Sequence, residues 1–372
     1  MKRRRWLLPI MLLALLWVSF SRPTYAPPVA AIVRLRLNYL ERVIREGSGP
    51  ATTLGQLGTQ NPEWALFTRS FTTYGLANLA AQDSSFRREA SEYIGLAIRQ
   101  VLSSSSRLPF GEPGPQEYAG YSLPSSVLYL GHLNLMLGCH RQLAANSPYR
   151  VLHDSLSAVL YRRYAHEPAG NLESYPGLRW LPDNTVALAS LALHSRLTGS
   201  RYAAAGRRWV AAARTRWLAP ATGLLASQVD ARGQVREGPR GSMLGWGIWF
   251  IARFDSVLAR QQYQRYQASG STNLGVLRLY REWPGRYATT AGDVDSGPLL
   301  LGYGISATTT AFADAVALRD WRNAQRLRRV ISLGSREIMA DSALHYGVRF
   351  IDLDASPLSE ALLLWADVPA SK

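Results

Sequence analysis

Cysteine and lysine are almost absent from this chain of 372 residues. Cys139 is the one cysteine, which excludes an intrachain disulfide and any zinc site built from several cysteines. Lys2 and Lys372 are the only lysines, so arginine supplies nearly all of the positive charge behind a net +16. The arginines are scattered in pairs such as Arg207-Arg208, and no nucleic-acid-binding motif accompanies them. We therefore expect solvated helix faces and no nucleic-acid partner.

The motifs of several large enzyme classes are missing as well. The sequence has no Gly-rich phosphate loop and no H-E-x-x-H pattern. Ser242 lies in Gly-Ser-Met-Leu-Gly, but Arg240 stands where the nucleophile elbow of an α/β-hydrolase needs glycine. Asp293 and Asp295 supply fewer oxygen ligands than a hard cation needs. The sequence therefore predicts an enzyme without a cofactor and without a metal.

One long apolar run is present, at the N-terminus. Lys2 to Arg5 precede an apolar stretch from Trp6 to Phe20, and a cleavage point after Ala26 is conceivable. The pattern predicts a signal peptide or membrane anchor over 1–26 and a single domain over 27–372; a buried first helix is the alternative. We expect a protein of the bacterial inner membrane facing the periplasm, or a secreted one if 1–26 is removed.

The remainder of the sequence predicts helices that follow one another in pairs. In 182–198, Val186, Ala189 and Leu193 recur at helical spacing, Pro182 suits a first turn and Gly199 a helix end. Ser200 is then expected to cap the next helix, and so short a link makes the two helices antiparallel. The predicted segments are 29–46, 62–81, 83–103, 123–144, 147–165, 182–198, 200–218, 242–256, 257–268, 297–318, 320–337 and 357–366.

Twelve helices in six pairs predict an all-α fold, an (α/α)6 toroid in which six helical hairpins close into a ring. An α-solenoid is the alternative, but no repeat of fixed period supports it. A short β-hairpin is expected at Leu224 to Val235. Four loops that lead into predicted inner helices combine carboxylates with aromatic residues, which favours one shared pocket. These loops are 108–124, 171–183, 236–246 and 291–303.

The stretch Gly131-His132-Leu133-Asn134-Leu135-Met136 resembles linalool dehydratase/isomerase, a terpenoid enzyme with a six-hairpin α/α barrel. Tyr74-Gly75-Leu76-Ala77, Pro182-Asp183-Asn184-Thr185-Val186-Ala187 and Asp293-Val294-Asp295-Ser296-Gly297 are similar to further stretches of that family, in the same order, over residues 60–335. The resemblance implies the toroid and retention of His132 and Tyr74. The two catalytic cysteines of the family correspond to Ser174 and Asp183 here, and a family tyrosine corresponds to Ser242.

Five residues are therefore candidates for catalysis. His132 and Tyr74 would orient or protonate a hydroxyl group, because histidine titrates near neutral pH. Asp183 would act as general acid or base if burial beside Trp180 raises its pKa, although a helix start would lower it. Asp293 and Asp295, two residues apart, would share a proton. The structural alternatives are a core histidine, a helix-capping aspartate and a turn closed by Ser296.

Eight further residues are candidates for substrate binding, through aromatic faces, hydroxyl groups or the guanidinium of Arg240 on an acidic substrate group. They are Glu117, Tyr118, Ser174, Trp180, Arg240, Ser242, Trp246 and Tyr303. Core packing of the aromatics, an ordinary polar loop at Glu117 and an ordinary surface arginine at Arg240 are the alternatives.

The first functional hypothesis is an exported lyase, isomerase or hydratase that acts on a hydroxylated small molecule by acid–base catalysis. The second is a carbohydrate-active hydrolase or lyase, because paired carboxylates with aromatic platforms suit sugars. The third is a non-catalytic envelope protein that binds a ligand. Membrane association is expected through the N-terminal segment, and homo-oligomerisation stays open.

Overall fold

The computed structural model describes residues 24–114, 118–285, 292–297, 299–350 and 353–369. Most of the predicted signal peptide or anchor and the candidate Glu117 lie outside these residues. Tyr25 lies inside them and is buried, although the domain was predicted to begin at residue 27. None of the helices in the described ranges is long and apolar enough to cross a membrane.

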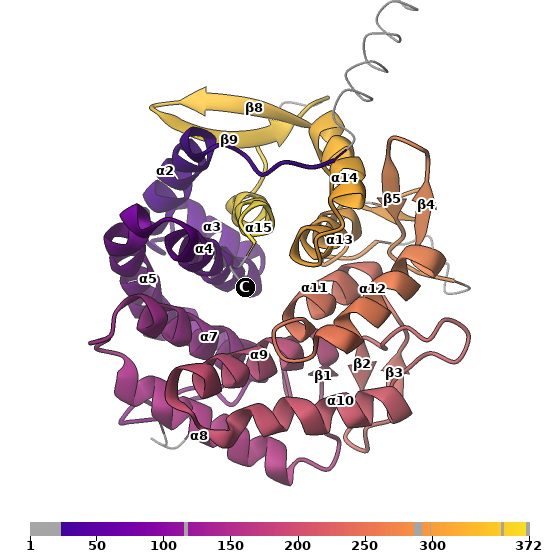
Figure 1. Ribbon diagram of the computed structural model, residues 1–372. Helices are drawn as coiled ribbons and strands as arrows, with labels where there is room; N and C mark the ends of the chain where they lie inside the picture. Colours follow the sequence, from indigo (N-terminus) through magenta and orange to yellow (C-terminus); the bar gives the residue numbers. More distant parts are fainter. Residues whose placement is uncertain (1–23, 115–117, 286–291, 298, 351–352, 370–372) are drawn as a thin grey trace, which may run out of the picture.

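Six inner helices close a ring, confirming the predicted toroid. Each packs on the next, and α15 packs on α4 to complete the circle, as the view along the ring axis shows (Figure 1). The inner helices are α4 (Pro62–Gln82), α7 (Val127–Leu143), α9 (Leu181–Thr198), α11 (Gly241–Ile251), α13 (Ile305–Ala317) and α15 (Pro357–Asp367).

Six outer helices surround this ring, and each precedes its inner partner in the sequence. They are α2 (Ala30–Glu46), α5 (Arg87–Val101), α8 (Arg150–His166), α10 (Ala204–Arg216), α12 (Ser256–Gly270) and α14 (Trp321–Gly334). Two short helices, α3 (Thr53–Gln60) and α6 (Ser104–Arg107), and three 3-10 turns, η1 (Ser84–Phe86), η2 (Leu108–Phe110) and η3 (Arg201–Ala203), lie in the connections.

Burial explains which helices are inner. Every residue of α9 from Leu181 to His194 is buried, because its neighbours in the ring and the outer helices cover it on all sides. Pro182 lies in its first turn and Gly199 ends it in the left-handed conformation, as predicted. Ser200 precedes η3 without a capping hydrogen bond to its side chain, and the next α-helix begins only at Ala204.

Nine short strands occur in the connections. They are β1 (Arg179–Trp180), β2 (Gln228–Val229), β3 (Val235–Glu237), β4 (Ser271–Asn273), β5 (Arg278–Tyr280), β6 (Leu299–Leu300), β7 (Tyr303–Gly304), β8 (Ser335–Ala340) and β9 (Ala343–Val348). β1, β2 and β3 form one antiparallel sheet, which confirms the expected hairpin; the other strands pair as β4–β5, β6–β7 and β8–β9.

The prediction of a helix over 297–318 was wrong at its N-terminal boundary. Leu301 and Gly302 both have positive φ, the signature of a two-residue type I′ turn, so β6 and β7 pair here and α13 begins only at Ile305.

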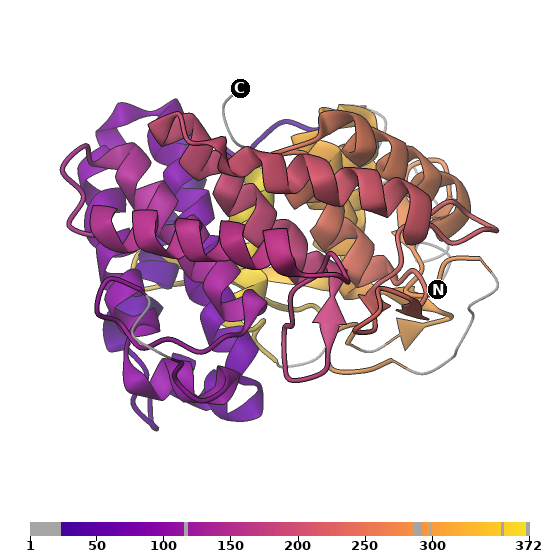
Figure 2. The ribbon, with the colours of Figure 1, turned by 90° about the horizontal axis from the view of Figure 1, so that it is seen from below.

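The two ends of the ring differ. Tight turns lead from inner to outer helices at one end, whereas the long connections with β1, β2 and β3 lead from outer to inner helices at the other (Figure 2). All inner helices begin at this second end, which we call the loop end; the first is the turn end.

Candidate active site

Two inner helices begin with the same pair of residue types at the loop end. Pro62 and Glu63 open α4, and Pro182 and Asp183 open α9. Proline suits a first turn because its missing N–H would find no partner there, and it fixes the direction in which the next side chain leaves the helix. The closed ring brings the two carboxylates near enough for the charge of Glu63 to act on Asp183.

The Asp183 carboxyl is 7% exposed. Burial raises its pKa to about 8, helped by the negative charges of Glu63 and Asp295, against an opposing hydrogen bond from Ser174. Glu63 and Asp295 are near enough for their charges to act on Asp183, and Asp295 also acts on Glu63. Burial therefore outweighs the helix start in setting this pKa, and Asp183 is mostly protonated at neutral pH.

Sequence reasoning missed Glu63. Burial raises its pKa too, while the Tyr175 hydroxyl donates a hydrogen bond to Oε1 and opposes that rise. The repeat of proline followed by an acid at the start of two inner helices was the signal that could have found it.

Asp293 and Asp295 were predicted to share a proton, and the structure separates their roles. Asp293 Oδ1 accepts the backbone N–H groups of Asp295 at 3.1 Å and Ser296 at 2.9 Å, which closes a turn. Although partial burial acts the other way, the Ser296 N–H and Arg240 lower the pKa of Asp293. Burial and the charge of Asp293 raise the pKa of Asp295. Asp295 therefore belongs with the carboxylates, whereas Asp293 is an ionised anchor.

Arg240 was predicted to bind an acidic group of the substrate, but carboxylates of the protein already occupy it. It is 3% exposed, its Nε lies 3.0 Å from Oε1 of Glu282, and its Nη2 lies 2.7 Å from Asp293. Ser242, another predicted binding residue, donates its hydroxyl to Glu282 at 2.7 Å. This network fixes the loop that carries Asp295 to the start of α11.

His132 and Tyr74 are fully enclosed in the middle of the ring. The Tyr74 hydroxyl lies 2.9 Å from Nδ1 of His132, and the imidazole packs 5.1 Å from the Phe67 ring and 5.7 Å from the Trp246 ring. Burial lowers the pKa of His132 to about 3. His132 is therefore a neutral imidazole, a form that can orient a hydroxyl group but does not carry the extra proton near neutral pH, and Trp246 is part of the aromatic core around it.

The other predicted binding residues fall in three places. Ser174 is buried beside Asp183 and accepts the backbone N–H of Trp180 at 3.3 Å, so both belong to the carboxylate site. Tyr118 is buried in the loop before α7. Tyr303 bonds the Thr272 hydroxyl at 2.7 Å, which holds β7 against the β4–β5 hairpin.

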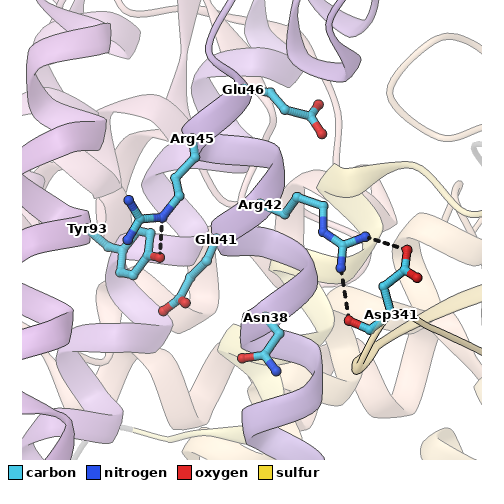
Figure 3. A pocket seen from close by; sticks show the side chains of 7 residues that line it. All are labelled: Asn38, Glu41, Arg42, Arg45, Glu46, Tyr93 and Asp341. Carbon is cyan, nitrogen blue, oxygen red and sulfur yellow. Dashed lines mark hydrogen bonds and ion pairs between the residues drawn. The ribbon is translucent and has the colours of Figure 1, made fainter.

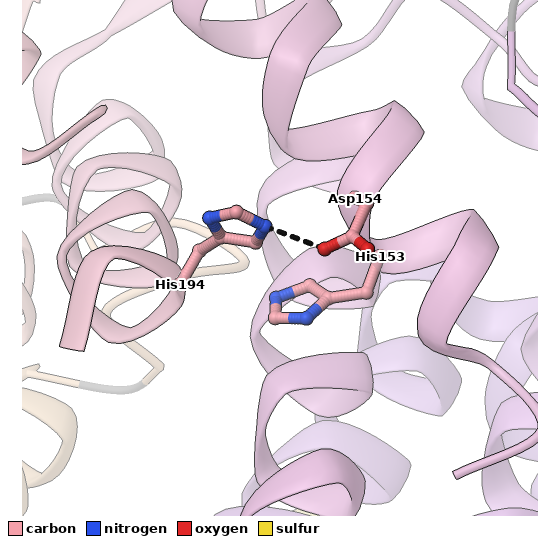
Figure 4. A group of neighbouring side chains, drawn as sticks. All are labelled: His153, Asp154 and His194. Atoms are coloured by element: carbon pink, nitrogen blue, oxygen red, sulfur yellow. Dashed lines mark hydrogen bonds and ion pairs between the residues drawn. The ribbon is translucent and has the colours of Figure 1, made fainter. Parts of the chain in front are cut away.

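A second group of titratable side chains lies in the outer part of the ring, between α8 and α9. His194 Nε2 lies 2.8 Å from Oδ1 of Asp154, and His153 lies beneath them (Figure 4). Two histidines and an aspartate can bind a metal ion. Here, however, the Arg141 guanidinium bonds the same Asp154 oxygen and lies 3.5 Å from His153 Nδ1, so a positive charge already occupies this place.

A depression of about 550 Å³ lies on the outer wall between α2, α5 and the β8–β9 turn (Figure 3). Arg45 Nε donates to the Tyr93 hydroxyl at 2.6 Å, and Arg42 pairs with Asp341. Both arginines are therefore already bonded to side chains that line the same depression. The carboxylates at the loop end remain the better candidate for an active site.

No family model matches this sequence. Among solved structures, the fold is similar to an unsaturated glucuronyl hydrolase specific for heparin, with a TM-score of 0.56, 12% identity and coverage of 90% of this chain and 94% of that one. The unsaturated glucuronyl hydrolase of Bacillus sp. GL1 gives a TM-score of 0.55, 14% identity and coverage of 90% and 96%. An inactive α-1,6-mannanase of Salegentibacter, with two aspartates replaced by alanine, gives a TM-score of 0.52 and 12% identity, with coverage of 83% of this chain and 89% of that one.

These similarities confirm the six-hairpin toroid. Membership of the linalool dehydratase/isomerase family stays a prediction.

Proposed function

We propose that this protein is a carbohydrate-active hydrolase or lyase whose site is formed by Asp183, Asp295 and Glu63. One observation carries the proposal: the Asp183 carboxyl is held protonated near neutral pH beside other carboxyls at the common end of the inner helices. A protonated carboxylic acid next to an ionisable carboxylate is the pair that glycosidic bond cleavage needs. Solved toroids of this shape named as hydrolases of sugars add support.

In this proposal Asp183 gives its proton to the glycosidic oxygen as the bond to the anomeric carbon breaks. Asp295, which is partly exposed, takes a proton from the attacking water, and the water oxygen forms the new bond to that carbon. In a lyase, Asp295 would instead take a proton from the sugar carbon. Glu63, held by Tyr175, keeps negative charge beside Asp183 and favours its protonated form.

The hypothesis of a hydroxylated, partly apolar substrate remains the second candidate, on one observation. Four apolar side chains of the segment that carries Asp295 face solvent, including Leu300 and Leu301 at 77% and 83% exposure; the others are Val294 and Ile305. An exposed apolar surface on the segment that carries Asp295 suits a substrate with a hydrocarbon part. A protein that only binds its ligand is the third possibility that the same test addresses.

The test offers the full chain an unsaturated glucuronyl disaccharide, an α-1,6-linked mannose oligosaccharide and a terpenoid alkenol. Products are followed by mass spectrometry in heavy-oxygen water, because hydrolysis incorporates the label and a lyase does not. Asp183→Asn and Asp295→Asn should each reduce turnover by about 10²–10⁴-fold. Asp341→Asn, an exposed aspartate on the outer wall, is the control.

Turnover of the alkenol alone would replace the carbohydrate proposal by the second candidate. Binding without turnover would favour the third. Full activity of Asp183→Asn on a sugar would remove Asp183 from the mechanism.

A further inference from the structure

The turn end of the ring is strongly basic. Its five inner-to-outer turns contain eleven arginines and three aspartates, with no lysine or glutamate. Asp83, Asp255 and Asp320 are all N-caps whose carboxylates accept backbone N–H groups, so part of their charge is used within the turns. The turns are 82–88, 141–150, 196–208, 251–256 and 317–322.

The loop end has the opposite balance. Its six outer-to-inner connections contain eleven arginines and sixteen aspartates or glutamates. The active-site carboxyls and the Arg240 network belong to this set. The connections are 46–63, 101–126, 166–183, 216–240, 270–304 and 334–357. The arginines are thus divided evenly between the two ends, whereas the acidic residues gather at the loop end, which gives the ring a positive and a more negative end.

Several arginines at the turn end are free to meet a partner. Arg88, Arg150, Arg201, Arg207 and Arg322 are exposed, and none of them forms an ion pair with a carboxylate among the described residues. They come from four different outer helices or turns, so the positive charge is spread over a broad surface.

The chain enters the domain at this same end. The segment from Thr24 to Val29 crosses from α14 to α2, and is the dark segment beside α15 in Figure 1. The Tyr25 N–H bonds the Trp321 carbonyl at 2.9 Å, and its hydroxyl donates to Asp367. Its ring packs 5.3 Å from Phe312. The first described residues therefore lie at the turn end, and Thr24 follows the end of the apolar run at Phe20 by four positions of sequence.

We propose that the turn end lies against the surface of an anionic lipid bilayer, to which the N-terminal apolar segment holds it. Arginine guanidinium groups bind lipid phosphates with paired hydrogen bonds, and anionic headgroups attract a broad basic surface within about 10 Å at moderate salt. The anchor and the basic surface act on the same end, so each supports the other. The loop end, with its carboxyls, then faces the aqueous compartment.

Cleavage after Ala26 conflicts with this arrangement. It would remove the buried Tyr25 and its bond to Asp367 from the folded domain. We therefore expect the N-terminal segment to stay attached.

The test reconstitutes the full chain into vesicles of phosphatidylcholine with or without phosphatidylglycerol, each carrying a quencher on the lipid headgroups. In a Cys139→Ser background, a fluorophore is placed either at Asn146→Cys, in a turn-end loop, or at Gln234→Cys, in the β2–β3 turn of the loop end. With anionic lipid we expect several-fold stronger quenching at Asn146→Cys, decreasing as salt is raised.

Charge reversal supplies the matched control. Arg201→Glu with Arg207→Glu should remove most of the difference between the two labels, whereas Arg162→Glu with Arg232→Glu, two exposed arginines toward the loop end, should preserve it. Equal quenching at the two labels, stronger quenching at Gln234→Cys, or failure of the chain to associate with anionic vesicles would overturn the proposal. None of these readouts depends on catalysis.

Discussion

The substitution Asp183→Asn tests the electrostatics of the site without a substrate. An aspartate in an unfolded chain has a pKa of about 3.9, whereas burial raises that of Asp183 to about 8 in the fold. The folded state therefore holds this proton more tightly than the unfolded state. Stability should be highest below about pH 4 and decrease by about 1.4 kcal/mol per pH unit until about pH 8.

Asparagine has nearly the same shape as aspartic acid and stays neutral, so the free energy of unfolding of the variant does not decrease with pH in this way. At about pH 7 it should be more stable than the wild type by roughly 4 kcal/mol. For a domain of this size that corresponds to a rise in melting temperature of roughly 5 °C. A site that is destabilised by its own acid, and inactive when that acid is neutralised, is the usual trade between stability and function.

Urea unfolding of the full chain in detergent, followed by tryptophan fluorescence between about pH 4 and pH 9, measures the difference. Asp341→Asn provides the control, because the Asp341 side chain is 82% exposed and should leave the pH dependence unchanged. Wild-type and Asp183→Asn curves that run parallel across this range would refute the raised pKa and, with it, the general acid.

Three further predictions concern the frame of the site. Arg240→Gln leaves the fully buried Glu282 without its cation and should cost about 3–5 kcal/mol in urea unfolding, so an unchanged midpoint would contradict the network. Gly245→Ala would place a Cβ 2.3 Å from a threonine of α13 and should lower the free energy of unfolding by about 1–3 kcal/mol. Gly247→Ala, on the same helix with no atom within 4 Å of the new Cβ, should leave that free energy unchanged or raise it. Equal effects of the two substitutions would argue against this packing of α11 and α13. Tyr25→Ala should cost about 3–5 kcal/mol in the full chain, and a silent substitution would mean that this residue does not hold the segment.

Local patterns were sufficient to predict the twelve helices of the ring. Pro182 at the start of α9 and Gly199 at its end act within one or two turns of the chain, and the same kind of boundary recurs in each hairpin. The β8–β9 hairpin was not predicted. The helix expected over 320–337 extended into its first strand, and no element was expected over 338–348.

The chemistry of the site could be predicted only in part. Asp183 was expected to be buried and acidic because its neighbours are aromatic, but Glu63 joins it only when the ring closes across 120 positions of sequence. Glu237, three residues before Arg240, is the one of its carboxylate partners that lies near it in sequence. Glu282 and Asp293, which bond it more closely, come from the next connection and could not be assigned to it from the sequence. His132 was assigned a pKa near neutrality, and only the aromatic enclosure reveals that it stays uncharged.

Closure of the ring has a consequence for biosynthesis. The sector between α4 and α13 is filled by α15, which follows the other described helices in the sequence, and α15 also supplies Asp367 for Tyr25 and Arg36. Until those residues have been synthesised, the apolar flanks of the first and fifth inner helices lack their neighbour. The ring therefore cannot close before α15 has been synthesised, and until then these flanks are open to contacts with other chains.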